Sequence, residues 1–163
     1  MNGKLRNMTA IYLFRDNKIL LLYREGGSVV NEVWTGSAGG HFEKNELNDA
    51  KACVLRELNE ELGLQPEDIE GLSLRYIALR HTKGEIRQNY YFFAELKEHV
   101  DENLNSNEGT CRWFSLDEID TLEMPLSAKY VMEHYCKVGY MTDALYVGVA
   151  GPDKAEFCEL RET

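Results

Sequence analysis

The chain has 163 residues, of which 44% are hydrophobic and 28% charged, and its formal net charge at pH 7 is −10. Its length is enough for a core that folds alone, so we expect a single domain over residues 1–163. The acidic balance argues against nucleic acids and anionic membranes as partners, because both select basic surfaces. A phosphorylated small molecule remains compatible, since a bound metal supplies positive charge locally.

The cysteines give no sign of a metal or disulfide framework. The four are widely spaced and include no Cys-x-x-Cys pair, which argues against a zinc site. The sequence shows neither an N-terminal signal peptide nor a long apolar span. We therefore expect a reduced, cytoplasmic protein.

The first part of the chain reads as strands and turns. Apolar runs separated by polar or glycine-containing segments predict strands, and three such runs occupy residues 8–14, 19–23 and 34–38. Residues 29–33 are compatible with either a short strand or a loop. The third strand is expected to deliver a glycine pair, Gly39 and Gly40, to the segment that follows.

The sequence predicts a helix between Asp49 and Gly63. Asp49 is a good N-cap because its side chain can accept a hydrogen bond from a free amide of the first turn. Gly63 is a good stop because glycine takes the left-handed conformation that ends many helices. An apolar stripe with helical spacing is formed by Val54, Leu55, Leu58 and Leu62.

Three carboxylates flank this stripe. Glu57, Glu60 and Glu61 lie three and four residues apart, which places them on one side of the helix. Ionised carboxylates this close repel one another, and a hard cation such as Mg²⁺ removes that repulsion. Arg56 is placed to orient one carboxylate through a forked hydrogen bond. An isolated pattern of this kind is more often a solvated acidic surface, so both interpretations stay open on spacing alone.

The segment after the helix predicts a hairpin with a basic tip. Strands are expected at residues 72–79 and 86–96, joined across residues 82–85. Arg80, Lys83 and Arg87 are candidate contacts for substrate phosphates. The alternative is a hairpin tip that only faces water.

The last third predicts four further features. These are a short strand at residues 111–114, a capping box at 115–119, a helix at about 128–137 and a strand at 145–150. The charged tail from Gly151 onward is expected to fray. Strands on both sides of one helix, with a second helix near the end, indicate an α/β sandwich.

The central stretch resembles the signature of the Nudix hydrolases. That signature is Gly-x5-Glu-x7-Arg-Glu-U-x-Glu-Glu-x-Gly-U, where U is aliphatic, and residues 56–64 match its second half at every fixed position. Gly40 and Glu46 keep the five-residue gap of its first half. Nine residues, not seven, separate Glu46 from Arg56, which leaves the role of Glu46 open. A second departure is Ala38, where many relatives have proline.

The resemblance implies a Nudix-type α/β/α sandwich with a mixed β-sheet, of the α/β (α+β) class. It implies hydrolysis of a nucleoside diphosphate linked to another group, with Mg²⁺ or Mn²⁺ as cofactor. Our leading expectation is a (d)NTP pyrophosphatase of the 8-oxo-dGTP type. The alternatives are a hydrolase of nucleotide sugars or other nucleoside diphosphates, and a non-catalytic nucleotide-sensing module. The expected partner is a small nucleotide, and a homodimer is compatible because many relatives form one.

The resemblance also assigns roles to residues. It implies that the metals are held by Glu57, Glu60, Glu61 and the backbone carbonyl of Gly40, while Arg56 orients a carboxylate. Glu43 is expected to pair with Arg56 or to line the site. Glu108 is our candidate for the base that activates water, with an exposed loop glutamate as the alternative.

Overall fold

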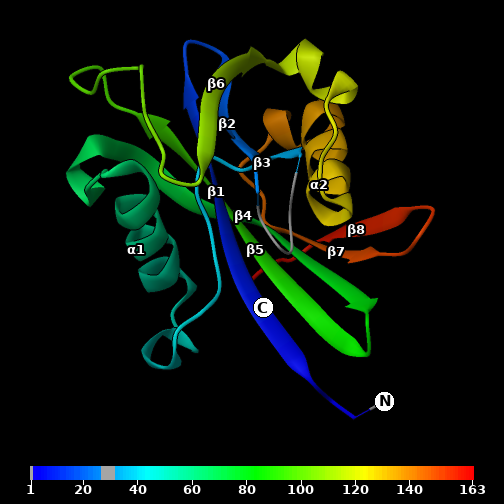
Figure 1. Ribbon diagram of the computed structural model, residues 1–163. Coiled ribbons are helices and arrows are strands. Elements are labelled where there is room, and N and C mark those ends of the chain that lie inside the picture. Colours follow the sequence, from blue (N-terminus) through cyan, green and yellow to red (C-terminus); the bar gives the residue numbers. More distant parts are fainter. Residues whose placement is uncertain (1, 27–31) are drawn as a thin grey trace.

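The computed structural model describes residues 2–26 and 32–163 (Figure 1). Within these residues eight strands form a mixed sheet in the order β3-β2-β1-β5-β4-β7-β8, and β6 pairs with β2 outside this path. The strands are β1 Leu5–Arg15, β2 Lys18–Arg24, β3 Val33–Thr35, β4 Ile69–Thr82, β5 Glu85–Leu96, β6 Gly109–Ser115, β7 Tyr146–Ala150 and β8 Ala155–Glu159.

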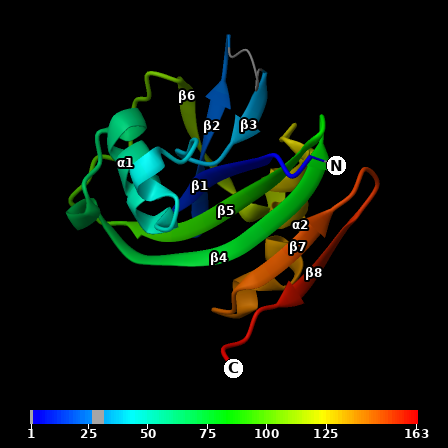
Figure 2. The same cartoon turned by 90° about the horizontal axis from the view of Figure 1, so that it is seen from below.

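Two helices cover the sheet from opposite sides (Figures 1 and 2). They are α1, Ala50–Leu62, and α2, Leu126–Lys137. Short 3₁₀ turns join the elements: η1 Lys44–Glu46, η2 Pro66–Asp68, η3 Leu116–Thr121 and η4 Gly139–Met141. The predicted α/β/α sandwich with a mixed sheet is confirmed. Within the described residues, no helix combines the length and apolar character needed to span a membrane.

The centre of the sheet is the parallel pair β1–β5, in register from Leu5↔Ile86 to Phe14↔Glu95. Side chains alternate between the two faces of a strand, and β1 therefore supplies both cores. Ile11 and Leu13 pack with the apolar stripe of α1, whereas Tyr12 and Phe14 pack on the α2 side. Burial on both faces explains why residues 10–14 of β1 form an unbroken apolar run.

Most predicted elements are present, with longer strands than the sequence indicated. The strand expected at residues 34–38 covers only Val33–Thr35, because the chain then leaves β2 and follows β1. Of the 29–33 segment, residues 29–31 lie outside the described part. The expected 128–137 helix begins earlier, at Leu126, with Pro125 as its N-cap.

The prediction for the C-terminal tail was wrong. Residues Ala155–Glu159 form β8, which pairs antiparallel with β7 from Tyr146↔Glu159 to Ala150↔Ala155. The tail is ordered because β7 offers an unpaired edge, and the turn at residues 151–154 returns the chain beside it.

Candidate active site

The glycine pair lies alongside the middle of β1. The amide of Thr9 donates to the carbonyl of Gly40 at 2.8 Å. Gly39 has a φ of 158°, and a Cβ there would overlap the carbonyl oxygen of Thr9. Glycine is required at position 39 because only a residue without a side chain brings the backbone this close.

The α1 helix begins and ends as predicted. The Asp49 side chain accepts from the Ala52 amide at 2.9 Å, and Gly63, with φ 69°, donates its amide to the carbonyl of Asn59 at 2.8 Å. Glu57 of this helix faces the glycine pair, and a Cβ at Gly40 would overlap the Glu57 carboxylate.

Arg56 forms hydrogen bonds with several of the carboxylates. Its Nη1 donates to Glu57 at 2.8 Å and to Glu60 at 2.9 Å, and its Nη2 donates to the carbonyl of His41 at 3.0 Å. Glu43 is a looser partner, with 3.9 Å between its Oε1 and the Nε of Arg56. One guanidinium thereby ties α1 to the loop that precedes it.

Glu46 holds this guanidinium from behind. Its two carboxylate oxygens accept from Nε and Nη2 of Arg56 at 2.7 and 3.0 Å, a bidentate pair. The Glu46 side chain is only 4% exposed, and the hydrogen bonds from Arg56 lower its pKa to about 2. The two extra residues of the loop therefore do not displace Glu46 from Arg56, because η1 turns the chain back before α1 starts.

Sequence reasoning missed Arg24, at the end of β2. Its Nη2 lies 3.0 Å from Glu61 and 3.3 Å from the carbonyl of Gly39, and its Nη1 lies 3.3 Å from Glu108. The Gly39 amide also donates to Glu61, at 3.3 Å. No local pattern marks Arg24, since 37 residues separate it from Glu61. The signal available was an arginine at the end of an apolar strand.

Burial sets the acidity of the two inner carboxylates. The side chains of Glu57 and Glu61 are 12% and 9% exposed, whereas that of Glu60 is 55% exposed. Burial raises the pKa of Glu57, and it raises the pKa of Glu61 to about 6 against the lowering effect of Arg24. A cation bound between such groups would be favoured, because it stabilises the charged form that burial disfavours.

The residues around the glycine pair fit a divalent metal in their chemistry. Buried carboxylate oxygens lie beside Gly40, where a side chain would have no room. Hard oxygen donors are the ligands that Mg²⁺ prefers. Within residues 2–26 and 32–163, no group of three or more Asp, Glu, His or Cys side chains is arranged so that it could hold a metal ion directly. Arg24 and Arg56 draw the carboxylates into ion pairs instead.

The basic hairpin lies apart from the carboxylates. No hydrogen bond or ion pair within the described chain joins Arg80, Lys83 or Arg87 to the glutamates of α1. Arg87 pairs with the buried Glu85 at 3.0 Å, so part of its charge is neutralised. The charge of Arg87 still acts on His41, the residue after Gly40. The pKa of His41 is lowered first by burial and then by the positive charges of Arg6 and Arg87.

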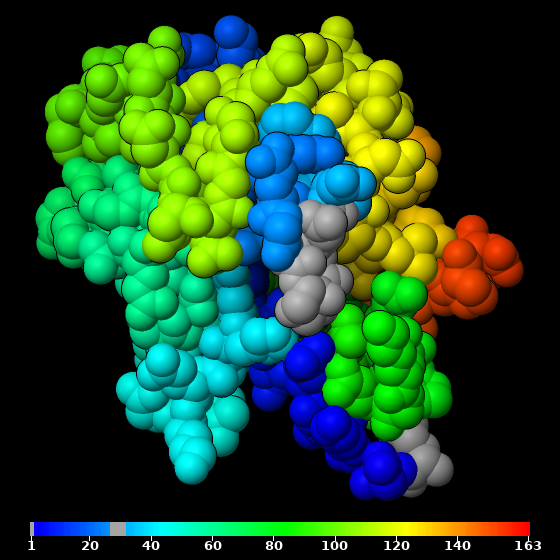
Figure 3. Space-filling view, viewed as in Figure 1, coloured from blue at the N-terminus to red at the C-terminus, as the bar shows by residue number. Residues whose placement is uncertain are grey.

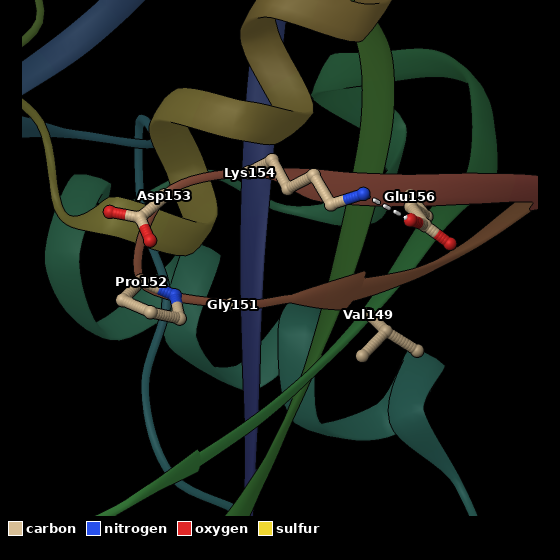
Figure 4. A pocket seen from close by; sticks show the side chains of 6 residues that line it. All are labelled: Val149, Gly151, Pro152, Asp153, Lys154 and Glu156. Carbon is tan, nitrogen blue, oxygen red and sulfur yellow. Dashed lines mark hydrogen bonds and ion pairs between the residues drawn. The ribbon is translucent and has the colours of Figure 1, made fainter.

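Figure 3 shows a gap in the surface between the segment that follows β3 and the start of β1. A separate hollow lies over the β7–β8 turn (Figure 4) and is lined by Val149, Gly151, Pro152, Asp153, Lys154 and Glu156. Its Lys154 is paired with Glu156 at 2.7 Å, and it holds none of the predicted site residues.

Comparison with known proteins places the chain in a family. The model of the NUDIX domain matches residues 4–135, and the chain belongs to this family. It is a Nudix hydrolase, which confirms both the resemblance in its motif and the enzyme prediction. A comparison with curated protein sequences gives no significant match.

Solved structures share the fold at low identity. A MutT protein from Bacillus halodurans is 23% identical, with 97% of this chain and 99% of that chain covered and a TM-score of 0.65. The ORF135 protein of E. coli is also 23% identical, with 87% and 96% covered and a TM-score of 0.64. An Ap4A hydrolase from C. elegans is 16% identical, with 85% and 99% covered and a TM-score of 0.63.

Proposed function

We propose that this Nudix hydrolase cleaves the pyrophosphate linkage of a nucleoside triphosphate with Mg²⁺ or Mn²⁺, as a (d)NTP pyrophosphatase of the 8-oxo-dGTP type. The observation that carries the proposal is the pair of buried carboxylates, Glu57 and Glu61, held against Gly40 and Gly39 by Arg56 and Arg24. The substrate class is supported by two neighbours of the same fold that are MutT proteins.

In this proposal Glu57, Glu60, Glu61 and the carbonyl of Gly40 hold the metal. A divalent ion there would neutralise the charge of the diphosphate and lower the pKa of a bound water. Arg56, itself held by Glu46, keeps Glu57 in place. Glu108 is half exposed beside Arg24, and we assign it as the base that takes the proton of the attacking water.

The basic hairpin would bind the distal phosphates. Arg80 and Arg87 are register partners across β4–β5, and Arg6 is the partner of Arg87 on β1. In-register residues point to the same face of a sheet, so the three cations form a row, in which Glu85 pairs with Arg6 at 3.6 Å and with Arg87 at 3.0 Å. Lys83 lies at the turn beyond them, and a polyphosphate that leaves the glutamates would be attracted along this row.

Three further expectations belong to this proposal. The protein acts as one domain over residues 1–163; the family match ends at residue 135, yet β7 and β8 complete the same sheet. It works in a reducing, cytoplasmic compartment, in keeping with four free cysteines. A homodimer is the oligomer we would test first.

The test is identification of the products formed from a panel of nucleoside triphosphates, oxidised dGTP, nucleotide sugars and dinucleoside polyphosphates, each with Mg²⁺ and with EDTA. We expect Mg²⁺-dependent release of pyrophosphate from a triphosphate. Glu57→Gln and Glu61→Gln should each lower turnover by about two orders of magnitude or more. Glu67→Gln, an exposed change just beyond α1, is the matched control and should keep full turnover. Preference for a nucleotide sugar would contradict the proposed triphosphate substrate. Near-normal turnover of Glu61→Gln would contradict the assignment of Glu61 as a metal ligand.

A further inference from the structure

The last strand of the sheet, β8, has a free edge. It pairs with β7 and, within residues 2–26 and 32–163, with no other strand. The hairpin of β7 and β8 lies beyond residue 135, where the family match ends, and at the opposite end of the sheet from α1 (Figures 1 and 2). A free edge presents backbone amides and carbonyls that can pair with a strand of another chain.

The hydrogen bonds inside the hairpin determine which residues of β8 offer these groups. The Leu160 amide donates to the Leu145 carbonyl at 2.8 Å, and the Gly151 amide donates to the Lys154 carbonyl at 2.9 Å. In an antiparallel pair, residues that bond the neighbouring strand alternate with residues that do not. The even-numbered residues of β8 therefore bond β7. The residues whose amides and carbonyls face the free edge are Ala155, Phe157 and Glu159.

The length of β8 favours one register for pairing with a second copy of the chain. The strand has five residues, Ala155–Glu159, and Phe157 is the middle one. If two copies run antiparallel about a twofold axis at Phe157, every residue of one β8 lies opposite a residue of the other. The free amides and carbonyls then face one another, because Ala155 lies opposite Glu159 and Phe157 opposite Phe157.

The charges along the strand agree with this register. Arg161 of one copy lies opposite Asp153 of the other, and no two like charges are directly opposite. Opposite charges across strands are favourable, and like charges are not. An axis one residue earlier would set Glu156 against Glu156. An axis two residues later would set Glu159 against Glu159.

The hollow over the β7–β8 turn lies where the second copy of the strand would end (Figure 4). Val149, Lys154 and Glu156 are among the residues that line it. In this register the second copy's Leu160 lies opposite Lys154, and even-numbered residues of β8 share the face of Val149. Leu160 and Val149 are both exposed apolar side chains, so association would cover them together.

We propose that two copies of this chain associate through β8, antiparallel about a twofold axis at Phe157, so that the two sheets become continuous. The occupant of the free edge is thus a second copy of the same strand. This inference gives a location to the homodimer expected above and does not rest on the proposed hydrolysis. The contact is small, so we expect the weak association that is typical of small interfaces.

Sedimentation equilibrium from about 1 to 300 µM protein measures the association, and we expect a dissociation constant of roughly 1–100 µM. Glu159→Pro removes an amide at the free edge and should weaken the dimer at least ~10-fold. The monomer should keep its Tm, because this amide does not bond β7. Glu159→Ala is the matched control: it removes the same side chain, keeps the amide and should leave the dissociation constant within about 2-fold.

A charge exchange tests the register. Arg161 bonds Glu159 of its own strand at 3.0 Å, and both side chains are exposed, so Arg161 is able to turn toward a second copy. Asp153→Arg and Arg161→Asp each place like charges opposite one another and should weaken the dimer about 3- to 10-fold. The double variant restores opposite charges and should return the dissociation constant toward that of the wild type. A double variant weaker than either single variant would overturn the register.

Crosslinking locates the contact directly. Glu156→Cys places a thiol opposite Cys158 of the second copy, and oxidised glutathione should convert the pair to a disulfide-linked dimer while it is reduced to glutathione. The control carries Cys158→Ser as well and should stay uncrosslinked. A wild-type dimer linked from Cys158 to Cys158 would place the axis one residue later and overturn this arrangement.

Two further results would overturn the proposal. One is a monomer at every concentration up to about 300 µM, which would mean that the charges of β8 protect its edge. The other is a dimer that Glu159→Pro does not weaken, since its interface would lie elsewhere. Turnover by each subunit should be the same in Glu159→Pro and the wild type, so failure of the dimer and failure of the proposed hydrolysis are observed separately.

Discussion

The buried pair between Glu46 and Arg56 permits a quantitative prediction. The pKa of Glu46 falls from 4.5 to about 2 in the folded protein, chiefly through the hydrogen bonds from Arg56. That difference corresponds to about 3 kcal/mol of the free energy of unfolding at pH 7. Because the pKa is depressed on folding, this stabilisation is present above about pH 4.5 and is lost as the pH falls from there toward about 2.

Glu46→Gln keeps the volume of the side chain and removes its charge. We expect the free energy of unfolding to drop by about 2–3 kcal/mol at pH 7. The difference from the wild type should then narrow as the pH falls below 4.5, by up to about 1.4 kcal/mol for each pH unit. Urea denaturation at several pH values between neutral and acidic measures both quantities.

Glu60→Gln is the matched control, because Glu60 bonds the same guanidinium but is 55% exposed. We expect it to cost at most about 0.5 kcal/mol. Two results would contradict the reasoning. One is a Glu46→Gln deficit that is the same at neutral and acidic pH, which would indicate packing instead of charge. The other is a deficit no larger than that of Glu60→Gln.

Three further predictions concern the glycine loop, the α1 cap and the hairpin. Gly40→Ala should lower turnover at least ~10-fold, because the added methyl overlaps the Glu57 carboxylate; Gly151→Ala, in the β7–β8 turn, should have no effect, and equal turnover of the two variants would show that the loop adjusts. Asp49→Ala removes the N-cap bond and should lower stability by about 1 kcal/mol, seen as a drop of roughly 2–4 °C in Tm; an unchanged Tm would mean that water replaces the cap. Arg87→Ala should raise KM for a triphosphate several-fold with kcat nearly unchanged, and a KM equal to that of the wild type would take the hairpin out of substrate binding.

The sequence by itself was sufficient for α1 and its carboxylates. An N-cap at Asp49, a left-handed glycine at position 63 and the spacing of Glu57 and Glu61 are all set within a few residues. Hydrogen bonds over such short separations form from local chemistry, so the pattern transfers directly to the structure. Local turn chemistry likewise predicted the β4–β5 hairpin, whose turn holds Lys83 and Gly84 at positive φ.

Tertiary structure decided what surrounds that helix. Arg24 meets Glu61, Tyr12 stacks on Tyr91, and β8 completes an edge that β7 left open. Each of these depends on which strands become neighbours. Pairing order is set by how the whole chain buries its two cores, and no stretch of local sequence encodes it. Local sequence therefore specified the acidic helix. The residues that contact its carboxylates were determined only by the packing of distant strands against it.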